Sequence, residues 1–285
     1  MQVIFNSLIR AAELGLLAVG LTMVYDLLKF ANFSHTTFAT IGAYLALLLS
    51  SNAGLSVYLG AIIAIPVVGL LGVLLDKVVF KRLRGSSPVI LMITSFGVSL
   101  ALRNVIRAIW GSDIRSFDIP LYRGINILGG MITPIQIGII VIAIVVMIIF
   151  HILLHNTRLG KSMRATSDNV SLAQASGIET EKVIQVVWFI GTAFAALAGI
   201  LMGLDTQVQP RMGFDIIIPV FSATILGGLG NPYGAMLGAL ALGFAENIGI
   251  TWFNIPTGYK PAIAFGILIL ILLVRPSGIM GKKGL

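Results

Sequence analysis

The chain has 285 residues, of which 57% are hydrophobic and only 11% charged, against roughly 25% charged residues in an average soluble domain. A soluble fold of this size has too little interior to bury so many apolar side chains, so the composition excludes that class and predicts a membrane protein. The net charge of +8 does not indicate nucleic-acid binding, because the basic residues lie in loops between apolar runs. The absence of cysteine excludes disulfide bonds and cysteine-ligated metal sites.

Uncharged stretches predict membrane-spanning helices, since about 20 apolar residues cross the ~30 Å hydrocarbon core. A short element over 215–228 precedes a glycine-rich turn, and residues 36–50 are apolar but short. The remaining spans are longer. The predicted fold is an all-α, polytopic transmembrane bundle with about eight crossings and one short broken or re-entrant element, and we expect residues 1–285 to form one transmembrane domain. The predicted crossings are 6–28, 36–50, 57–75, 88–110, 134–154, 183–204, 232–251 and 259–275.

Positively charged loops predict the orientation of the bundle. Three basic clusters fall on one side of the membrane if 134–154 and 183–204 each cross once and 215–251 crosses twice. By the positive-inside rule that side is the cytoplasm. We therefore expect a multi-pass inner-membrane protein, surrounded by lipid, with residues 156–182 and the C-terminus in the cytoplasm and the N-terminus outside. The clusters are Lys77, Lys81, Arg82 and Arg84; Arg158, Lys161, Arg164 and Lys182; and Arg275, Lys282 and Lys283.

A run of polar residues interrupts the apolar sequence after the first span. Five of the six residues from 32 to 37 are polar, which predicts a non-helical break or a loop at the membrane edge. Irregular backbone at membrane depth is tolerated only where protein buries it or where it lines a cavity. Asn32, Ser34, His35 and Thr36 are therefore candidates for a pathway or gate, with a purely structural role as the alternative.

A second break is predicted at LGGLGNPYG (226–234), because glycine and proline together end a helix. Its candidates for a pore wall or gate are Gly227, Gly228, Gly230 and Pro232. The glycine spacing does not fit a dinucleotide-binding fingerprint. The pairs Gly199-xxx-Gly203 and Gly234-xxx-Gly238 are spacings that predict close helix packing.

Two further motifs resemble a nucleotide-binding loop and a metal site, but each lacks a residue that such a site requires. Gly160-Lys161-Ser162 resembles the end of a nucleotide-binding loop, but the glycine required five positions earlier is His155. His151 and His155 are one helical turn apart and have no third ligand at metal spacing.

Glu13 is the acidic residue that lies deepest in a predicted span. Intramembrane acids are functional candidates, and three roles are open for Glu13: part of a pathway, an ion pair with Arg10, or contact with a partner subunit. Glu246 and Asp205 lie at or near span ends and are expected to be hydrated.

The longest connection, residues 156–182, is the most informative segment. Ser167 or Asp168 can cap a short helix that ends near Ser176, where Gly177 stops it. This helix is too short and too weakly apolar to enter the membrane. It predicts a docking element for a cytoplasmic partner, and the alternative is a solvated connector.

Three ordered blocks resemble the permease subunits of ABC importers for branched-chain amino acids, in the superfamily that also holds ribose-type permeases. LGKSMRATSDNVSLAQASGI (159–178) is similar to that family's ATPase-contacting loop, and GLTMVYDLLKFANFSHTTFATIGAY (20–44) to its first-helix signature. TILGGLGNPYGAMLGALALGFAE (224–246) is similar to its glycine-rich block, and the length resembles the shorter of the two paired permeases. The candidate coupling positions in the first block are Gly160, Lys161, Arg164, Ala165, Asp168, Asn169, Ala173, Gly177 and Ile178.

The resemblance implies a permease subunit that forms the pathway for branched-chain or related small amino acids in an ATP-driven importer. It implies no enzyme activity and no cofactor in this chain, because two cytoplasmic ATPase subunits bind ATP and Mg²⁺. The other implied partners are a second homologous permease and an extracytoplasmic solute-binding protein. The alternatives are an ABC permease for urea, short amides or another small solute and, in a different class, an ion-coupled secondary transporter.

Overall fold

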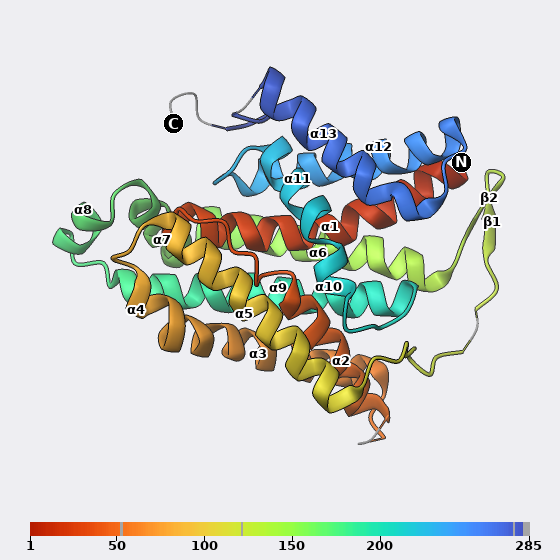
Figure 1. Ribbon diagram of the computed structural model, residues 1–285, viewed down its shortest axis with the longest axis horizontal. Helices are drawn as coiled ribbons and strands as arrows, with labels where there is room; N and C mark the ends of the chain where they lie inside the picture. Colours follow the sequence, from red (N-terminus) through yellow and green to blue (C-terminus); the bar gives the residue numbers. More distant parts are fainter. Residues whose placement is uncertain (52–53, 121, 276, 282–285) are drawn as a thin grey trace.

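The computed structural model describes residues 1–51, 54–120, 122–275 and 277–281, and these are largely helical (Figure 1). Seven helices in these ranges are long and apolar enough to cross a membrane, and two shorter apolar helices accompany them. The predicted polytopic helical bundle is confirmed, with 36–50 and 215–228 corresponding to the two short helices; Lys282 and Lys283 lie outside the described residues. The helices are α1 (Gln2–Leu28), α2 (Thr37–Ser51), α3 (Val57–Leu75), η1 (Asp76–Phe80), α4 (Lys81–Leu83), α5 (Pro88–Trp110), α6 (Pro134–Asn156), α7 (Arg158–Asp168), α8 (Val170–Ala175), α9 (Thr180–Asp205), α10 (Met212–Asp215), α11 (Ile217–Gly227), α12 (Pro232–Phe253), η2 (Thr257–Tyr259) and α13 (Lys260–Val274).

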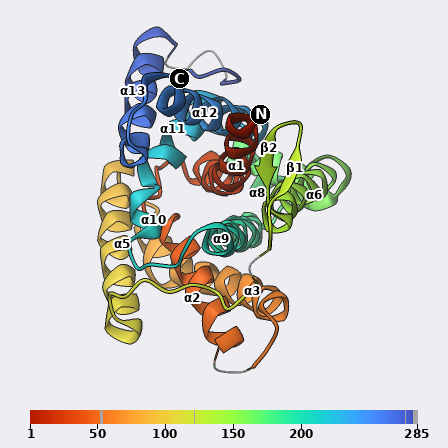
Figure 2. The ribbon, with the colours of Figure 1, turned by 90° about the vertical axis from the view of Figure 1, so that its right-hand side faces the viewer.

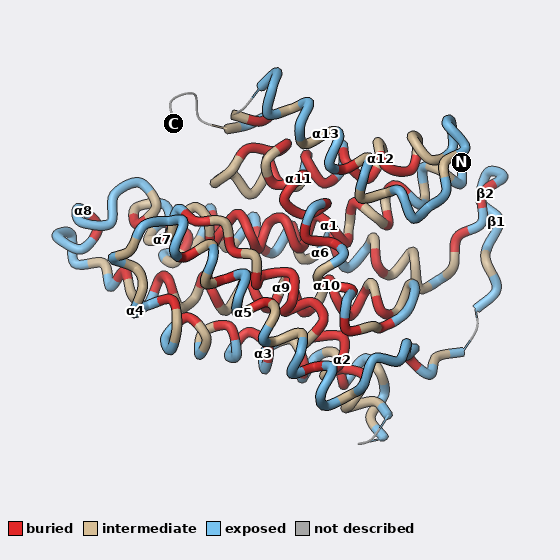
Figure 3. The backbone as a smooth tube through the Cα atoms, viewed as in Figure 1, coloured by how far each residue is buried: buried red, intermediate tan, exposed pale blue. Residues whose placement is uncertain are grey.

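Helices α1 and α9 form the centre of the bundle (Figures 2 and 3). In their most apolar 18-residue windows 83% and 67% of the residues are buried, against 6–33% in the other five spans. The two helices cross at Gly20 and Gly191, where a Cβ on Gly20 would lie 2.7 Å from the carbonyl oxygen of Gly191. Small residues that let backbones approach closely are typical of helix packing in membranes.

Three of the four glycines predicted to pack closely against a neighbouring helix do so, whereas Gly203 meets the side chains of Val208 and Phe117. Gly199 on α9 lies directly against the backbone of Ala39 on α2. Gly234 and Gly238 on α12 lie against the backbone of α11, at Gly227 and Ala223. A methyl group at any of these three glycines would overlap the neighbouring helix.

The basic segments gather at one end of the bundle. Helices α4, α7 and α8 and the C-terminal segment lie at this end, named the loop end below, whereas the N-terminus lies at the opposite end (Figure 1). A short hairpin of β1 (Ile125–Ile127) and β2 (Gly130–Ile132) lies beside the N-terminus. The backbone N–H of Met131 donates to Oε1 of Gln2 (2.8 Å), which ties the hairpin to α1.

Two crossings are broken. At 1.5 Å per residue, α2 is about 22 Å long and α11 about 16 Å, both too short for the ~30 Å core. Each follows an irregular segment, residues 29–36 before α2 and residues 206–216 before α11, which contains the four-residue α10. The two segments meet, because Gly213 donates its N–H to Oγ1 of Thr40 (3.0 Å) and packs against the carbonyl of Thr36.

Candidate functional site

The predicted coupling loop begins with a helix that the sequence reasoning treated as loop. Thr157 caps α7 by accepting the N–H of Gly160 (3.1 Å). Gly160 lies so close to the carbonyl of Leu154 that any side chain there would overlap it, and Arg164 donates to the same carbonyl oxygen. Gly160 and Arg164 therefore fold α7 back against the end of α6. Lys161 and Asp168 are exposed on α7, and Ala165 is half-buried.

Helix α8 is short and capped at both ends. The predicted caps Ser167 and Asp168 are wrong: they belong to α7, and Oδ1 of Asn169 accepts the N–H of Leu172 (3.0 Å) to begin α8. The C-terminal end is a Schellman motif. The N–H of Ile178 donates to Ala173 (3.0 Å) and that of Gly177 to Gln174 (2.9 Å), with Gly177 at φ +84°.

The caps leave apolar side chains of α8 pointing outward. Ala173 is buried, but 40% of Val170 and 65% of Leu172 are exposed. Helix α8 lies at the extreme loop end of the molecule (Figure 1). Exposed apolar residues on a capped, protruding helix are suited to contact another protein.

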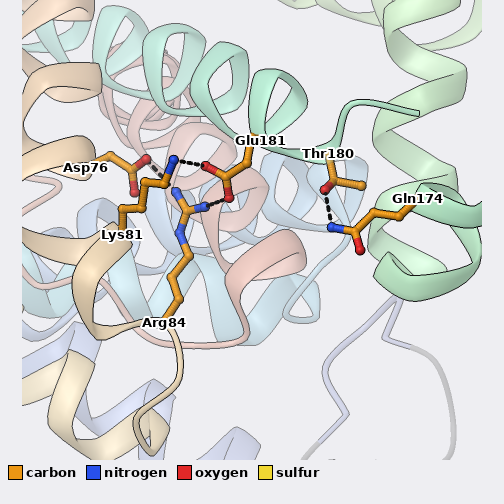
Figure 4. A network of polar contacts seen from close by, with 6 residues as sticks. All are labelled: Asp76, Lys81, Arg84, Gln174, Thr180 and Glu181. Carbon is orange, nitrogen blue, oxygen red and sulfur yellow. Dashed lines mark hydrogen bonds and ion pairs between the residues drawn. The ribbon is translucent and has the colours of Figure 1, made fainter. Parts of the chain in front are cut away.

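Polar contacts join this loop to the spans (Figure 4). Nε2 of Gln174 donates to Oγ1 of Thr180 at the start of α9 (2.9 Å). Beside it, Arg84 pairs with both Glu181 and Asp76 (2.5 Å each), and Lys81 also pairs with Glu181 (3.0 Å). The network links the start of α9 to η1 and to α4 and the residue after it.

A cavity of about 260 Å³ lies between α8 and the ends of the spans, with Phe30, Phe80 and Val170 among its lining residues. Contact between α8 and the bundle is therefore incomplete on this side, and the Gln174–Thr180 hydrogen bond is the contact of Figure 4 that joins α8 to the spans. The sequence did not predict the pairing of Arg84 with Glu181, because these two residues are 97 positions apart in the chain.

The polar break after α1 is deeply buried. Asn32, Ser34, His35 and Thr36 are each at most 1% exposed. Oδ1 of Asn32 accepts both the N–H and the hydroxyl of Ser34 (3.1 and 2.7 Å). The His35 ring lies against Gly20 on α1, and neither ring nitrogen makes a hydrogen bond of normal geometry, nor does the Thr36 hydroxyl.

Two serines of α5 hold this break in place. Oγ of Ser95 accepts the N–H of Phe33 (3.0 Å), and Oγ of Ser99 lies 2.8 Å from Oγ1 of Thr37. Sequence reasoning missed both serines, although two buried hydroxyls one turn apart in an apolar helix were an available signal. The break is thus positioned by α1, α5 and α10 together.

The glycine-rich segment 226–234 has different surroundings. Gly227 ends α11, Gly228 packs against the backbone of Met280 and Gly281, and Gly230 lies beside Asp26 at the end of α1. Nδ2 of Asn231 donates to the carbonyl of Met280 (3.1 Å), and Pro232 begins α12. The segment is a tight turn next to the C-terminal segment, and the irregular backbone that meets the 29–36 break is 206–216 instead.

Glu13 pairs with Arg10, one of the three roles that the sequence left open. The Arg10–Glu13 distance is 3.7 Å, and Nε of Arg10 also pairs with Oε2 of Glu246 on α12 at 2.9 Å. The expectation that Glu246 is hydrated is wrong, because this residue is fully buried between α1 and α12. Burial without a partner would be costly, and Arg10 supplies the partner.

Within the described residues no group of three or more His, Asp or Glu side chains is placed to hold a metal ion. The bundle offers instead a buried polar break and an exposed, capped helix at the loop end. Both features belong to a transporter-like architecture, in which discontinuous helices lie where the backbone is enclosed by protein.

Comparison with known proteins identifies the family. Residues 3–272 match the family model described as "Branched-chain amino acid transport system / permease component". The high-affinity branched-chain amino acid transport system permease protein LivH of Salmonella typhimurium is 33% identical, and the alignment covers 99% of this chain and 96% of LivH. The corresponding BraD protein of Pseudomonas aeruginosa is 34% identical over the same shares.

More distant matches agree with this assignment. The ribose import permease protein RbsC of Escherichia coli is 26% identical, covering 95% of this chain and 84% of RbsC. A solved structure, PsaBC from Streptococcus pneumoniae in complex with Fab, aligns with a TM-score of 0.56 and 15% identity over 95% of this chain and 91% of that chain, which shows a shared fold. The chain belongs to the family of permease components of branched-chain amino acid transport systems.

Proposed function

We propose that this chain is the shorter permease subunit of an ABC importer for branched-chain amino acids, and that residues 1–285 act as one transmembrane permease domain. The proposed partners are a second homologous permease, two cytoplasmic ATPases that bind ATP and Mg²⁺, and an extracytoplasmic solute-binding protein. The identity of about a third with LivH and BraD over nearly the whole chain supports this assignment.

The observation that carries the proposal is the architecture of α8. A six-residue helix capped by Asn169 and ended by Gly177 presents Val170 and Leu172 outward. We propose that it inserts into a groove of an ATPase, as helices with apolar anchors do. Motion of α8 then reaches α9 through Thr180 and reaches η1 and α4 through the Arg84–Glu181 pair.

The solute is proposed to pass near the break at 29–36. Among the described residues the buried Thr36 hydroxyl has no hydrogen-bond partner and the His35 ring nitrogens have none of normal geometry, and such groups are costly unless another state of the protein satisfies them. Alternating access requires two arrangements of the spans that ATP and the binding protein stabilise differently. A change in the contacts of Ser95 and Ser99 with the break is the proposed difference between them.

The proposed topology places the loop end in the cytoplasm and the N-terminus outside. Lys77, Arg82 and Lys161 are among the basic residues at that end, in accord with the positive-inside rule. The inner membrane is the proposed location.

The solute class is chosen from the relatives, and urea, short amides or another small solute are the alternatives. An ion-coupled secondary transporter is less well supported, because the deep acids Glu13 and Glu246 are both paired with Arg10 and a proton relay needs acids that can change partners.

The docking role of α8 is tested by measuring how much ATPase co-purifies with the permease. Leu172→Ala removes an exposed side chain whose burial in an interface stabilises by roughly 1.5–3 kcal/mol. We expect at least a tenfold loss of ATPase binding. The matched control is Val89→Ala, which truncates a 61% exposed apolar residue at the start of α5 and should leave ATPase binding unchanged. If both variants and the unaltered chain bind the same amount of ATPase, the docking role of α8 is contradicted.

A further inference from the structure

A groove on the outer surface of the bundle belongs to none of the features described above. It encloses about 520 Å³ between α1, α6 and α12. Its walls are apolar, and side chains such as Ile144 and Leu240 that line it are also exposed on the outer surface. The groove is therefore open on the outer surface of the bundle. In Figure 2, α6 lies on the opposite side of the bundle from α5 and α10, which hold the polar break.

The groove is polar only near the loop end. Here Tyr233 of α12 meets two histidines of α6, with its hydroxyl oxygen 2.9 Å from Nδ1 of His151 and 3.0 Å from Nδ1 of His155. The two imidazole rings stack with their centroids 4.6 Å apart. The sequence reasoning regarded these histidines as isolated, and the structure shows that Tyr233 joins them.

One pair of tautomers satisfies all three contacts of the cluster. In this arrangement Nδ1 of His155 carries a proton, which it shares between the backbone carbonyl of His151 (3.3 Å), a group that can only accept, and the Tyr233 oxygen. The Tyr233 hydroxyl then donates to Nδ1 of His151. A neutral His151 consequently carries its proton on Nε2, which leaves an N–H donor that the cluster does not use.

The surroundings of the cluster are positively charged. Arg164 on α7 lies near enough to Tyr233 for electrostatic interaction, and Arg158 and Lys161 are exposed on the same helix. An imidazole N–H close to Arg164 complements an anion, and a phosphate oxygen is a strong acceptor for such donors.

The length of the apolar groove indicates what is attached to the anionic group. Along α6 the lining runs from Ile140 to His151, eleven residues or about 16 Å at 1.5 Å per residue. One leaflet of the hydrocarbon core is about 15 Å thick. An acyl chain that starts at the headgroup level therefore reaches the end of the groove near the middle of the membrane.

We propose that this groove binds one phospholipid of the loop-end leaflet. Its acyl chain lies along Gly15, Ile144 and Met147, and its phosphate accepts hydrogen bonds from His151 and from the basic side chains of α7. Free phosphate alone does not explain the site, since it leaves the apolar groove unfilled. The lipid bridges α1, α6 and α12, and through α7 it touches the start of the coupling loop.

The test measures the lipid that stays bound to the purified full-length protein, by native mass spectrometry after exchange into detergent with added phosphatidylglycerol or diacylglycerol. Phosphatidylglycerol should bind and diacylglycerol, which lacks the phosphate, should bind roughly tenfold less, the factor expected from losing one charge-assisted hydrogen bond. Millimolar inorganic phosphate should not displace the lipid. Equal retention of both lipids, or displacement by inorganic phosphate, overturns the proposal.

Two matched pairs of variants test the two halves of the site. Ile144→Trp fills the groove and should abolish retention, whereas Val145→Trp adds the same bulk to the neighbouring exposed residue, which does not line the groove, and should not. For the headgroup, His151→Ala should lower retention of phosphatidylglycerol, and the control Lys182→Ala, an exposed basic residue outside the groove, should not. Equal retention by the members of either pair contradicts the site.

Discussion

At the scale of single residues, Arg10 stabilises two buried acidic side chains by pairing with both of them. It lies on α1 between two acids, Glu13 on its own helix and Glu246 on α12. Removing one partner of a buried ion pair leaves an uncompensated charge, which costs far more than the pair contributes. The three residues thus act as one unit that fastens α12 to the central helix.

Arg10→Met is expected to destabilise the protein by about 3–5 kcal/mol, because Glu246 then stays buried and unpaired. The double variant Arg10→Met, Glu246→Gln should lose less than the sum of the two single variants, as measured by thermal unfolding in detergent. Additive losses would show that the two residues do not interact. Arg107→Met, at the exposed end of α5, is the control.

Gly199 is a second residue whose role is local. Its α-carbon lies against the backbone of Ala39, with no room for a methyl group. Gly199→Ala is therefore expected to lower the thermal midpoint by several degrees, as overpacking by 1–3 kcal/mol does. Gly138→Ala on α6 is the matched control, because a Cβ there meets no atom within 4 Å; it should be neutral or stabilising by up to ~1 kcal/mol. The same drop in both variants would refute close packing as the cause.

Several of these residues were visible in the sequence, and others were not. Gly199 and Gly234 stood out by their spacing, and Glu13 and Arg10 by their charge inside an apolar run. The burial of Glu246 was not predictable, because its position in α12 does not reveal that Arg10 lies opposite. The spacing of Ser95 and Ser99 in an apolar span was visible, but their partners, 62 residues away, were not.

At the scale of elements, the coupling loop depends on how its short helices end. Helix α8 has six residues, too few to be stable alone. Its stability therefore depends on the hydrogen bonds that cap its two ends. Gly177 adopts φ +84°, a conformation that glycine and asparagine accept and proline cannot.

Gly177→Pro is therefore expected to unwind the end of α8 and to abolish ATPase-coupled uptake while the protein still inserts in the membrane. Gly177→Asn should retain most of the uptake, since asparagine tolerates the left-handed region. Transport assays paired with measurements of membrane-inserted protein check both. Full uptake by the proline variant would contradict the coupling role of α8.

The elements were predictable where hydrophobic length decided them and unpredictable where tertiary contacts did. The long spans and the short segment 215–228 followed from uncharged run lengths. Helix α7 was not predicted, because its start depends on the fit of Gly160 against Leu154. The second break was expected at the glycines of 226–234, yet the segment that meets the first break contains Gly213. Its contact with Thr36 depends on three-dimensional packing alone.

At the scale of the whole molecule, each half contains a long helix, a break and a short helix in the same order. Helix α1, the break at 29–36 and α2 correspond to α9, the break at 206–216 and α11. Helix α1 starts at the end opposite to the loop end and α9 starts at the loop end, so the two units run in opposite directions (Figure 1). The similar fragments FATIG (38–42) and FSATILGG (221–228) both lie in the half-helix that follows a break. Inverted repeats with broken helices are common among transporters.

The proposed orientation can be measured directly, because the sequence contains no native cysteine. Ala175→Cys on α8 should react with a membrane-impermeant thiol reagent only after the cells are opened. Leu128→Cys at the tip of the hairpin, a 78% exposed side chain, should react in intact cells. The reverse pattern would place the loop end outside and contradict the assignment of the basic clusters to the cytoplasm.

The central claim is that this permease takes its energy from partner ATPases through α8, and uptake of labelled leucine into proteoliposomes tests it most directly. The vesicles contain this chain, the second permease and the two ATPases, with the binding protein added outside and ATP trapped inside. We predict leucine accumulation that requires ATP and the binding protein and that Leu172→Ala reduces about tenfold. Accumulation by the permeases alone, driven by an ion gradient and unaffected by ATP or by Leu172→Ala, would contradict the claim.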